Sequence, residues 1–436
     1  MPRPRIVIVG GGFAGHNAAR TLYDTLGDTA EVVLVNTTDY FLYMPLLPEV
    51  AAGVLDPRRV SVSLSATLPG VHCVLGNVYK INVLERTVNL RTQEDQEVSL
   101  SYDRLVLAAG SVNNLLPIPG VTENAHGFRG VPEAVYLRDH ITRQIELADL
   151  TDDPAERDSR CTFVVVGAGY TGTEIAAQGP LLTDALVRTR PRLHGQRIRW
   201  LLLDKAERVL PELDPRLGRT AAKVLAKRGV EVLAGTSIDE ATATGVRLTT
   251  GRGVASRTLV WCVGVRPDPL VEDLGMPTTK GRIVVDEYLS VPDHPDVFAC
   301  GDAAAVPDLT RPGELTAMTA QHAERQGRLC ARNVAASLGD GERRAYRHHD
   351  LGFVVDLGGI EAAANPMGVP LSGLAAKVVT RTYHLIAMPG NRLRVAMDWA
   401  LDAVQSRQSV QLGLVRSPEV PLDSATPELP DNKPKS

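Results

Sequence analysis

Residues 6–20 read IVIVGGGFAGHNAAR, and this stretch decides the fold of the first part of the chain. Its four leading residues, IVIV, predict a strand that is buried on both faces and ends at a glycine cluster. Gly10, Gly12 and Gly15 follow in the spacing G-x-G-x-x-G, which permits a tight turn, backbone approach to a pyrophosphate and close packing of the next helix. The helix directs its N-terminal amides at the phosphates. The stretch predicts a dinucleotide site.

The same pattern returns in the middle of the chain. Residues 162–166, TFVVV, predict a second buried strand, and Gly167, Gly169 and Gly172 repeat the glycine spacing before another helix. Two dinucleotide sites in one chain indicate a flavin bound by one domain and a nicotinamide presented by the other. Hydride transfer requires the two rings to meet within about 3.5 Å. The repeat therefore predicts an electron relay.

A further strand follows each glycine pattern, and its end usually carries an acid that binds a ribose. The first of these strands, residues 31–35, leads to Asn36, whose amide can still hydrogen-bond a hydroxyl group. The second, residues 199–203, leads to Asp204, which is expected to bind both ribose hydroxyls and to repel a 2′-phosphate. NADH is therefore favoured over NADPH, and the nearby Lys205 and Arg208 are expected to keep that preference moderate.

The remaining segments predict the completion of the flavin domain. Residues 71–101 alternate in short runs typical of a small antiparallel sheet. Residues 105–111, LVLAAGS, predict a strand followed by small residues, where the backbone passes close to a bulky group. Residues 297–302, VFACGD, predict a strand whose end brings Asp302 to the ribityl hydroxyls or pyrophosphate of the flavin, and residues 303–305 are expected to open a helix.

Composition narrows the function classes. A formal net charge of -4 and an aromatic content of 4% give no indication of nucleic-acid binding. Five scattered cysteines suit a reducing compartment, and the histidines lack metal-ligand spacing, so no metal site is expected. No leader and no apolar run of about 18 residues is visible. The expected location is cytoplasmic, peripheral on the inner face of the cell membrane.

The sequence resembles the two-dinucleotide-domain flavoproteins of the pyridine-nucleotide oxidoreductases, and among them the type II NADH:quinone oxidoreductases. The motifs that carry this resemblance lie in the family's order and are IVIVGGGFAG, YMPLLPEVAAG, LVLAAGS, FVVVGAGYTGTEIA, VWCVGVRPDPL, VFACGDAA, TAQHAERQG and RTYHLIAMPGNRLRVAMDW. The implied fold is α/β, with two Rossmann-like dinucleotide-binding domains, for FAD and NADH, and a C-terminal α-rich domain.

The resemblance also implies site residues. FAD is expected at Gly10, Gly12, Gly15 and Asp302, and NADH at Gly167, Gly169, Gly172 and Asp204. With their motif neighbours, the expected cofactor-binding positions are Gly10, Gly12, Phe13, Ala14, Gly15, Asn36, Ala109, Gly110, Gly167, Gly169, Tyr170, Gly172, Glu174, Asp204, Gly264, Gly301, Asp302, Ala320 and Gln321.

Two residues are candidates for a catalytic role. The resemblance places Glu174 where the nicotinamide and flavin rings meet, and there a carboxyl group could orient the nicotinamide or assist proton transfer. Alternatively, Glu174 is an acid that complements a helix dipole. Gln321 lies in TAQHAERQG, which matches the quinone-side helix of the family, and could donate to a quinone carbonyl or simply belong to a solvated face.

The C-terminal region bears on the electron acceptor. Residues 372–388 and 392–404 predict two helices with Trp399 on an apolar face and Lys377 and Arg381 among the polar positions. Such a basic amphipathic pair could lie at a membrane surface and collect quinone, or form a homodimer or core contact. Residues 417–436 are expected to be disordered. The predicted segments are flavin domain 1–115 and 276–345, connection 116–158, NADH domain 159–275, amphipathic region 346–415 and tail 416–436.

The leading hypothesis is an enzyme that passes a hydride from NADH to FAD and then two electrons to a membrane quinone, without proton pumping. Two alternatives stay open. One is a soluble diaphorase or a sulfide:quinone-type oxidoreductase of the same fold, since Cys161 and Cys330 resemble the paired cysteines of the latter, although Cys161 also suits core packing. The other is a non-catalytic sensor that binds FAD and NADH.

Overall fold

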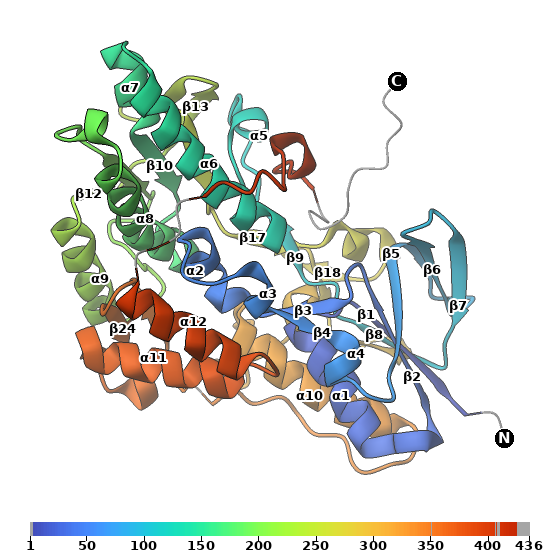
Figure 1. Ribbon diagram of the computed structural model, residues 1–436. Helices are drawn as coiled ribbons and strands as arrows, with labels where there is room; N and C mark the ends of the chain where they lie inside the picture. The colour runs from blue at the N-terminus through green and yellow to red at the C-terminus, as the bar shows by residue number, and fades with distance from the viewer. Residues whose placement is uncertain (1–2, 350, 406, 408–409, 425–436) are drawn as a thin grey trace. The chain divides into compact units, whose positions relative to one another are not determined.

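The computed structural model of this chain describes residues 3–349, 351–405, 407 and 410–424 (Figure 1). The chain divides into two compact units, each built from segments that are far apart in the sequence. The first unit comprises Met1–Leu42, Ser61–Val112 and Val265–His349, and the second comprises Tyr43–Val60, Asn113–Gly264 and Asp350–Ser436.

The first unit is organised around an eight-stranded sheet of order β20-β21-β8-β1-β2-β5-β6-β7. Strands β21, β8, β1, β2 and β5 are parallel, and β6 and β7 continue the sheet in antiparallel fashion. The main elements are β1 (Arg5–Val9), α1 (Phe13–Leu26), β2 (Glu31–Asn36), β3 (Tyr40–Leu42), β4 (Ser61–Ser63), α4 (Leu64–Thr67), β5 (His72–Asn82), β6 (Thr87–Thr92), β7 (Glu97–Ser101), β8 (Arg104–Leu107), β17 (Val265–Pro267), β18 (Thr278–Thr279), β19 (Arg282–Val284), β20 (Ser290–Val291), β21 (His294–Ala299), β22 (Ala304–Ala305) and α10 (Ala320–Ser337). Strand β9 (Ser111–Asn113) lies at the boundary between the units.

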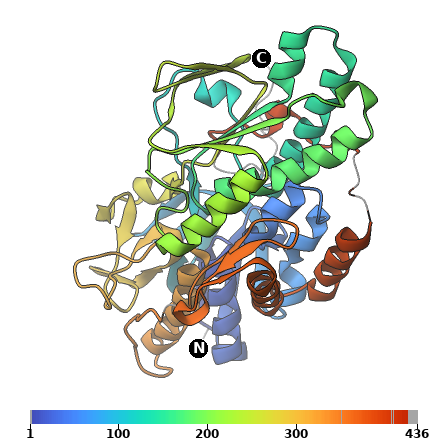
Figure 2. The same ribbon diagram turned by 90° about the vertical axis from the view of Figure 1, so that its left-hand side faces the viewer.

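The second unit contains a parallel four-stranded sheet of order β12-β11-β10-β16. Its main elements are α2 (Leu47–Ala51), α3 (Pro57–Val60), α5 (Val121–Asn124), α6 (Val131–Leu150), α7 (Pro154–Arg160), β10 (Thr162–Val166), α8 (Tyr170–Arg188), β11 (Arg199–Leu203), α9 (Pro215–Lys227), β12 (Val230–Leu233), β13 (Ile238–Thr242), β14 (Gly245–Leu248), β15 (Gly253–Ala255), β16 (Thr258–Trp261), β23 (Val354–Asp356), β24 (Ala362–Ala364), β25 (Leu371–Ser372), α11 (Gly373–Ala387) and α12 (Arg392–Val404). Figure 2 shows the small orange sheet β23-β24-β25 beside α9.

Both units share the strand order of a dinucleotide-binding fold. Counting from the strand before each glycine pattern, β5-β2-β1-β8-β21 has the order 3-2-1-4-5, and β12-β11-β10-β16 has the order 3-2-1-4. The strands before the glycines are almost completely buried because helices cover both faces of a parallel sheet. The predicted fold class, two Rossmann-like units, is confirmed.

Two local predictions are wrong. Residues 303–305 do not open a helix, because Ala304 and Ala305 form β22 and pair in parallel with β19, and the next long helix begins at Ala320. The prediction that the chain is disordered from residue 417 onward is also wrong for the described part of the tail. Residues 417–419 form a short 3₁₀ helix, and Leu422 is 1% exposed because it packs into the apolar core of the second unit. Residues 425–436 lie outside the described part of the chain.

Candidate functional site

The first glycine pattern forms a tight turn between β1 and α1. Gly10 has a φ of +99°, and a Cβ there would lie 2.3 Å from the carbonyl oxygen of Ala108. A Cβ on Gly15 would lie 1.7 Å from the carbonyl oxygen of Gly10, so the helix packs directly on the turn. Gly12, which caps α1, has no atom within 4 Å of its Cβ position. The turn is therefore closed on its protein side and open at the helix N-terminus, as phosphate binding requires.

The second glycine pattern repeats this geometry. Gly167 has a φ of +101°, and its Cβ would lie 2.1 Å from the carbonyl oxygen of Cys262, which takes the place of Ala108. A Cβ on Gly172 would lie 1.8 Å from the carbonyl oxygen of Gly167, and Gly169 again has open space around it. The two turns are built alike, and each can accept a pyrophosphate.

Asn36 and Asp204 hold the glycine turns in place. Oδ1 of Asn36 accepts a hydrogen bond from the N–H of Gly11 at 2.8 Å. Oδ2 of Asp204 accepts from the N–H of Ala168 at 2.5 Å, and Oδ1 accepts from the N–H of Ala206 at 2.8 Å. Equivalent positions thus perform the same structural task, one with an amide and one with a carboxylate. Their predicted contacts with ribose stay predictions.

Arg208 is committed to its own loop. Its guanidinium donates to the carbonyl oxygens of Leu210, Pro211 and Leu213 at 3.0, 2.7 and 2.7 Å. These bonds support Leu210, whose φ of +51° is strained for a leucine and whose N–H donates to the carbonyl oxygen of Ala168. Because its guanidinium is engaged within the loop, these contacts do not support the expected moderating effect of Arg208 on cofactor preference.

Asp302 lies in a buried turn after β21. The hydroxyl of Ser111 donates to Oδ2 of Asp302 at 2.7 Å, and burial raises the pKa of the carboxyl group. The preceding Gly301 has a φ of +70°, and its N–H donates to Oε1 of Gln326 at 2.8 Å. Gln326 in turn donates to the hydroxyl of Thr316 at 3.0 Å, so its amide supports this turn.

Helix α10 packs against α1 (Figure 1). Gly327 makes this contact possible, because a Cβ there would lie 2.1 Å from the carbonyl oxygen of Ala14. Phe13, the first residue of α1, packs edge-on against Phe41 with ring centroids 5.0 Å apart. The half-buried Ala320 and Gln321 form the first turn of α10. The remaining small residues that were expected near the flavin, Ala109 and Gly110, follow β8, and Gly110 has a φ of +78°.

Two other predicted cofactor-binding positions lie at the start of α8 and in the turn after β16. Tyr170, the first residue of α8, lies against Phe353 with ring centroids 6.0 Å apart. Gly264, in the turn after β16, has a φ of +85°, and its carbonyl oxygen accepts from the N–H of Asn114 at 3.1 Å. These contacts place both residues within the second unit, near the turn at Gly167.

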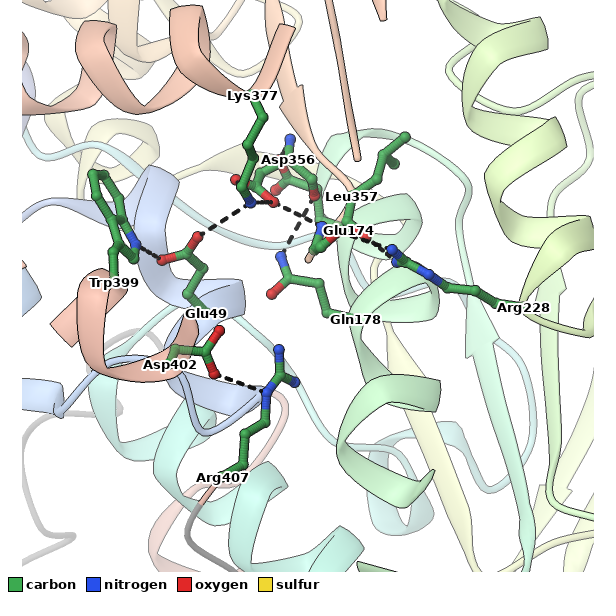
Figure 3. Close-up of polar contacts among 11 residues, drawn as sticks. Glu49, Glu174, Gln178, Arg228, Asp356, Leu357, Lys377, Trp399, Asp402 and Arg407 are labelled. Carbon is green, nitrogen blue, oxygen red and sulfur yellow. Dashed lines mark hydrogen bonds and ion pairs between the residues drawn. The ribbon is translucent and has the colours of Figure 1, made fainter. Parts of the chain in front are cut away.

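Glu174 belongs to a buried charged cluster (Figure 3). Oε1 of Glu174 accepts from the backbone N–H of Asp356 at 2.9 Å. Both carboxylate oxygens of Asp356 lie 2.6 Å from Nζ of Lys377, which is 4% exposed. Burial is the main cause that raises the pKa of Glu174 well above its usual value. The neutral form of the Glu174 carboxyl group is therefore favoured relative to that of an exposed glutamate.

Glu49, on α2, is a further member of this cluster. The indole N–H of Trp399 donates to its Oε2, and Nζ of Lys377 lies 4.0 Å from its Oε1. Burial, followed by repulsion from Asp356, raises the pKa of Glu49 to about 7. Beside the cluster, the hydroxyl of Tyr43 lies 3.0 Å from Nδ1 of His384, and burial lowers the pKa of that histidine to about 4.

Sequence reasoning missed most of this cluster. It placed Lys377 among the polar positions of an amphipathic helix, but Lys377 is buried and paired. Glu49 stood inside the apolar run YMPLLPEV and drew no attention. A single acid within such a run is a usable signal, because a buried carboxyl group requires a partner.

Cys161 and Cys330, which were considered as a pair, are both free thiols. Cys330 lies on α10 in the first unit, where its thiol is hydrogen-bonded to the thiol of Cys300, and this hydrogen bond and burial raise the pKa of Cys330. Cys161 lies in the second unit, is fully buried, and has its pKa raised to about 11 by burial. Thiols with raised pKa values are poor nucleophiles. Core packing explains Cys161.

Comparison with known proteins identifies the family. The sequence pattern of the pyridine nucleotide-disulphide oxidoreductases matches residues 4–327. The type II NADH:quinone oxidoreductase Ndh of Mycobacterium tuberculosis is 30% identical over 93% of this chain and 89% of its own length. The demethylphylloquinone reductase NdbB of Synechocystis is 30% identical over 91% of this chain and 96% of its own.

A solved structure agrees with the fold. NDH2 from Plasmodium falciparum, in complex with NADH, superimposes with a TM-score of 0.86, covering 94% of this chain and 100% of that chain at 16% identity. The sequence relatives decide the family, and the structural likeness supports the architecture. The chain belongs to the pyridine nucleotide-disulphide oxidoreductase family and, within it, to the type II NADH:quinone oxidoreductases.

Proposed function

We propose that this chain oxidises NADH and reduces a quinone with the help of bound FAD. The observation that carries the proposal is the pair of equivalent glycine turns, each with an open helix N-terminus at Gly12 or Gly169. A side chain at either position would occupy the space into which a pyrophosphate fits, so the residues suit two dinucleotides. FAD, when bound, accepts a hydride from NADH and releases two electrons to an acceptor.

The two units divide the binding work. Gly10, Gly12 and Gly15 would hold the pyrophosphate of FAD, and Asp302, which accepts a hydrogen bond from Ser111, would bind its polar chain. Gly167, Gly169, Gly172 and Asp204 perform the equivalent task for NADH. The carboxylate of Asp204 favours ribose hydroxyls over a 2′-phosphate because two negative groups repel each other.

Glu174 and Gln321 act on the reacting groups. Glu174 is buried and its pKa is raised, so it would orient the nicotinamide by hydrogen bonding and exchange a proton during turnover. Gln321, in the first turn of α10, donates a hydrogen bond to a quinone carbonyl. Both roles rest on the family's motif order and on the positions of these residues at helix starts.

The helix pair α11 and α12 presents an apolar face that we assign to the membrane surface. The exposed apolar side chains on this pair are Leu374, Val378, Ile386, Leu393, Met397, Leu401 and Val404. Arg392 and Arg394 are exposed at the start of α12, and their charge complements anionic lipid headgroups. In the described part of the chain, no helix is long and apolar enough to cross a bilayer. The protein lies on the inner face of the cell membrane.

An anaerobic titration tests the reaction. The purified yellow protein is expected to bleach when NADH is added and to regain its colour when a quinone follows. Bleaching by NADH with recovery by a soluble dye, but by no quinone, would identify a diaphorase. Bleaching by sulfide alone would identify a sulfide oxidoreductase. No bleaching by either donor would indicate a sensor.

Vesicle sedimentation tests the membrane surface. Leu393, on α12, is 74% exposed, and Leu393→Glu is expected to weaken binding to vesicles that contain anionic lipid. Leu84→Glu is the matched control, because Leu84 is 93% exposed in the β5–β6 turn of the first unit. Equal binding of both variants would exclude the assigned face. A change from dimer to monomer in Leu393→Glu, without loss of vesicle binding, would show that a second copy covers it.

A further inference from the structure

Glu49 is a buried carboxyl group that the mechanism above does not use. Its side chain is 3% exposed, and it lies on α2 in the segment Tyr43–Val60, which the second unit takes from the N-terminal part of the chain. Figure 3 shows it between Trp399, from α12, and Lys377, from α11. Such a group requires a partner or a proton.

The charges in the cluster do not balance. Three carboxyl groups, on Glu49, Glu174 and Asp356, share the ammonium of Lys377. Both carboxylate oxygens of Asp356 lie 2.6 Å from Nζ of Lys377, whereas Oε1 of Glu49 lies 4.0 Å from it. Two buried carboxyl groups therefore remain without a close cation of their own, and burial favours their neutral form.

Other groups that face Glu49 modulate this balance. The guanidinium of Arg381 lies over the ring of Trp399 at 4.8 Å and lowers the pKa of Glu49 less than the indole bond does. Asp356 raises the pKa of Glu49, and Glu49 in turn raises the pKa of Glu174. The ionisation of one glutamate thus opposes that of the other.

We infer that Glu49 is a second proton-holding carboxyl group of this enzyme, coupled to Glu174 through the Lys377–Asp356 pair, and that the indole N–H of Trp399 sets its ionisation. The inference rests on the proposed function for the fate of the proton. Conversion of a quinone to a quinol takes two electrons and two protons, whereas a hydride carries two electrons and one proton. Glu49 holds the second proton, releases it toward the reduced quinone as its own carboxylate forms, and regains a proton from water.

Trp399 provides a specific handle on this group. Its N–H bonds Oε2 of Glu49, and a hydrogen bond to the charged form favours ionisation. Trp399→Phe keeps an aromatic ring beneath Arg381 and removes the donor. Glu49 should then give up its proton at a pH about one unit higher, since a hydrogen bond to a charged group corresponds to a shift of that size.

Infrared titration of the FAD-loaded full chain tests the inference. The carbonyl band of a protonated carboxyl group is expected to disappear near pH 7 in the unmodified protein. This transition should be absent in Glu49→Gln and unchanged in Glu212→Gln, which alters an exposed acid of the same unit. In Trp399→Phe it should occur at a higher pH. A band that still disappears near pH 7 in Glu49→Gln, or that disappears at an unchanged pH in Trp399→Phe, would overturn the inference.

Turnover provides a second readout. We expect Glu49→Gln to flatten the pH dependence of kcat around pH 7 and to leave KM for NADH unchanged, whereas a merely structural role would lower kcat equally at every pH. If Glu49→Gln fails to retain FAD, the shift in Trp399→Phe decides the matter. Failure of NADH to bleach the flavin would overturn the proposed function and leave the titration intact, so the two failures are distinguishable.

Discussion

Oε1 of Glu174 accepts a hydrogen bond from the backbone N–H of Asp356 at 2.9 Å, although 182 residues separate the two in the sequence. The side chain of Asp356 is engaged elsewhere, because its carboxylate pairs with Lys377 and accepts a hydrogen bond from the N–H of Gly358 at 2.7 Å. The guanidinium of Arg228 donates to the carbonyl oxygens of Leu357 and Gly358 in the same turn. The turn after β23 therefore has a fixed position beside Glu174.

Glu174→Gln is expected to separate chemistry from structure. The amide oxygen can still accept from Asp356, so FAD content and the thermal midpoint should stay unchanged. The exchangeable proton is lost, and kcat should fall by about 100-fold, within the usual range for general acid–base catalysis. Steady-state assays with NADH and a soluble quinone measure the effect, and Glu212→Gln is the control. Normal turnover would remove Glu174 from the mechanism.

A pair of glycine substitutions distinguishes the binding face of the nicotinamide turn from its packing face. Gly169→Ala meets no atom within 4 Å, so the free energy of unfolding should not change, whereas NADH should bind about tenfold more weakly or worse. Gly172→Ala places a Cβ 1.8 Å from the carbonyl oxygen of Gly167 and should destabilise the fold by about 1–3 kcal/mol. Calorimetric binding and urea unfolding test both. Equal NADH affinity in Gly169→Ala would contradict the assigned binding face.

Cofactor preference is expected to depend on Asp204 and not on Arg208. Asp204→Asn leaves one side-chain oxygen to accept from the N–H groups of Ala168 and Ala206, and it removes the negative charge. The ratio of kcat/KM for NADPH to that for NADH should therefore rise about tenfold. Arg208→Ala should lower stability and leave this ratio unchanged, because the guanidinium serves three backbone carbonyls. A shift of the ratio in Arg208→Ala would return that residue to the cofactor site.

The histidine pair of the second unit should make the protein acid-sensitive. The rings of His126 and His140 lie 4.8 Å apart, and burial lowers their pKa values to about 4 and about 3. Between pH 6.5 and about 4 the unfolded chain binds more protons, so the free energy of unfolding falls as the pH falls. Between pH 6.5 and 5, the free energy of unfolding of His140→Gln should therefore fall by about 2 kcal/mol less than that of the unmodified protein. Urea unfolding across this range measures the difference, and parallel pH profiles would contradict the assignment.

The described part of the C-terminal tail should contribute to stability. Leu422 is 1% exposed, and its carbonyl oxygen accepts from the side-chain amide of Asn113 at 3.1 Å. The N–H groups of Leu412 and Gly413 donate to Asp139 at 2.9 and 2.8 Å. Leu422→Ala should cost about 2–5 kcal/mol in unfolding free energy, whereas Leu412→Ala, at a side chain 53% exposed, should cost little. Equal midpoints for the two variants would show that the tail is dispensable.

The sequence by itself determined the two glycine turns, their strands and helices, and the assignment of the family. Strand β10 spans the predicted residues 162–166, and α12 spans the predicted residues 392–404. These features are local, because a buried strand followed by G-x-G-x-x-G specifies its own geometry over about 15 residues. The predicted cofactors, FAD and NADH, follow from the same turns and from the family.

The tertiary structure alone decided the charged cluster around Glu174. Glu49, Glu174 and the Asp356–Lys377 pair come from three distant segments, and the local pattern predicted a polar surface position for Lys377. Whether a charged side chain is exposed or buried depends on what packs over it from elsewhere in the chain, and no short period in the sequence encodes that. The same reason explains Leu422, which stands in a Pro-rich segment of disordered composition and becomes buried because the second unit offers an apolar site for it.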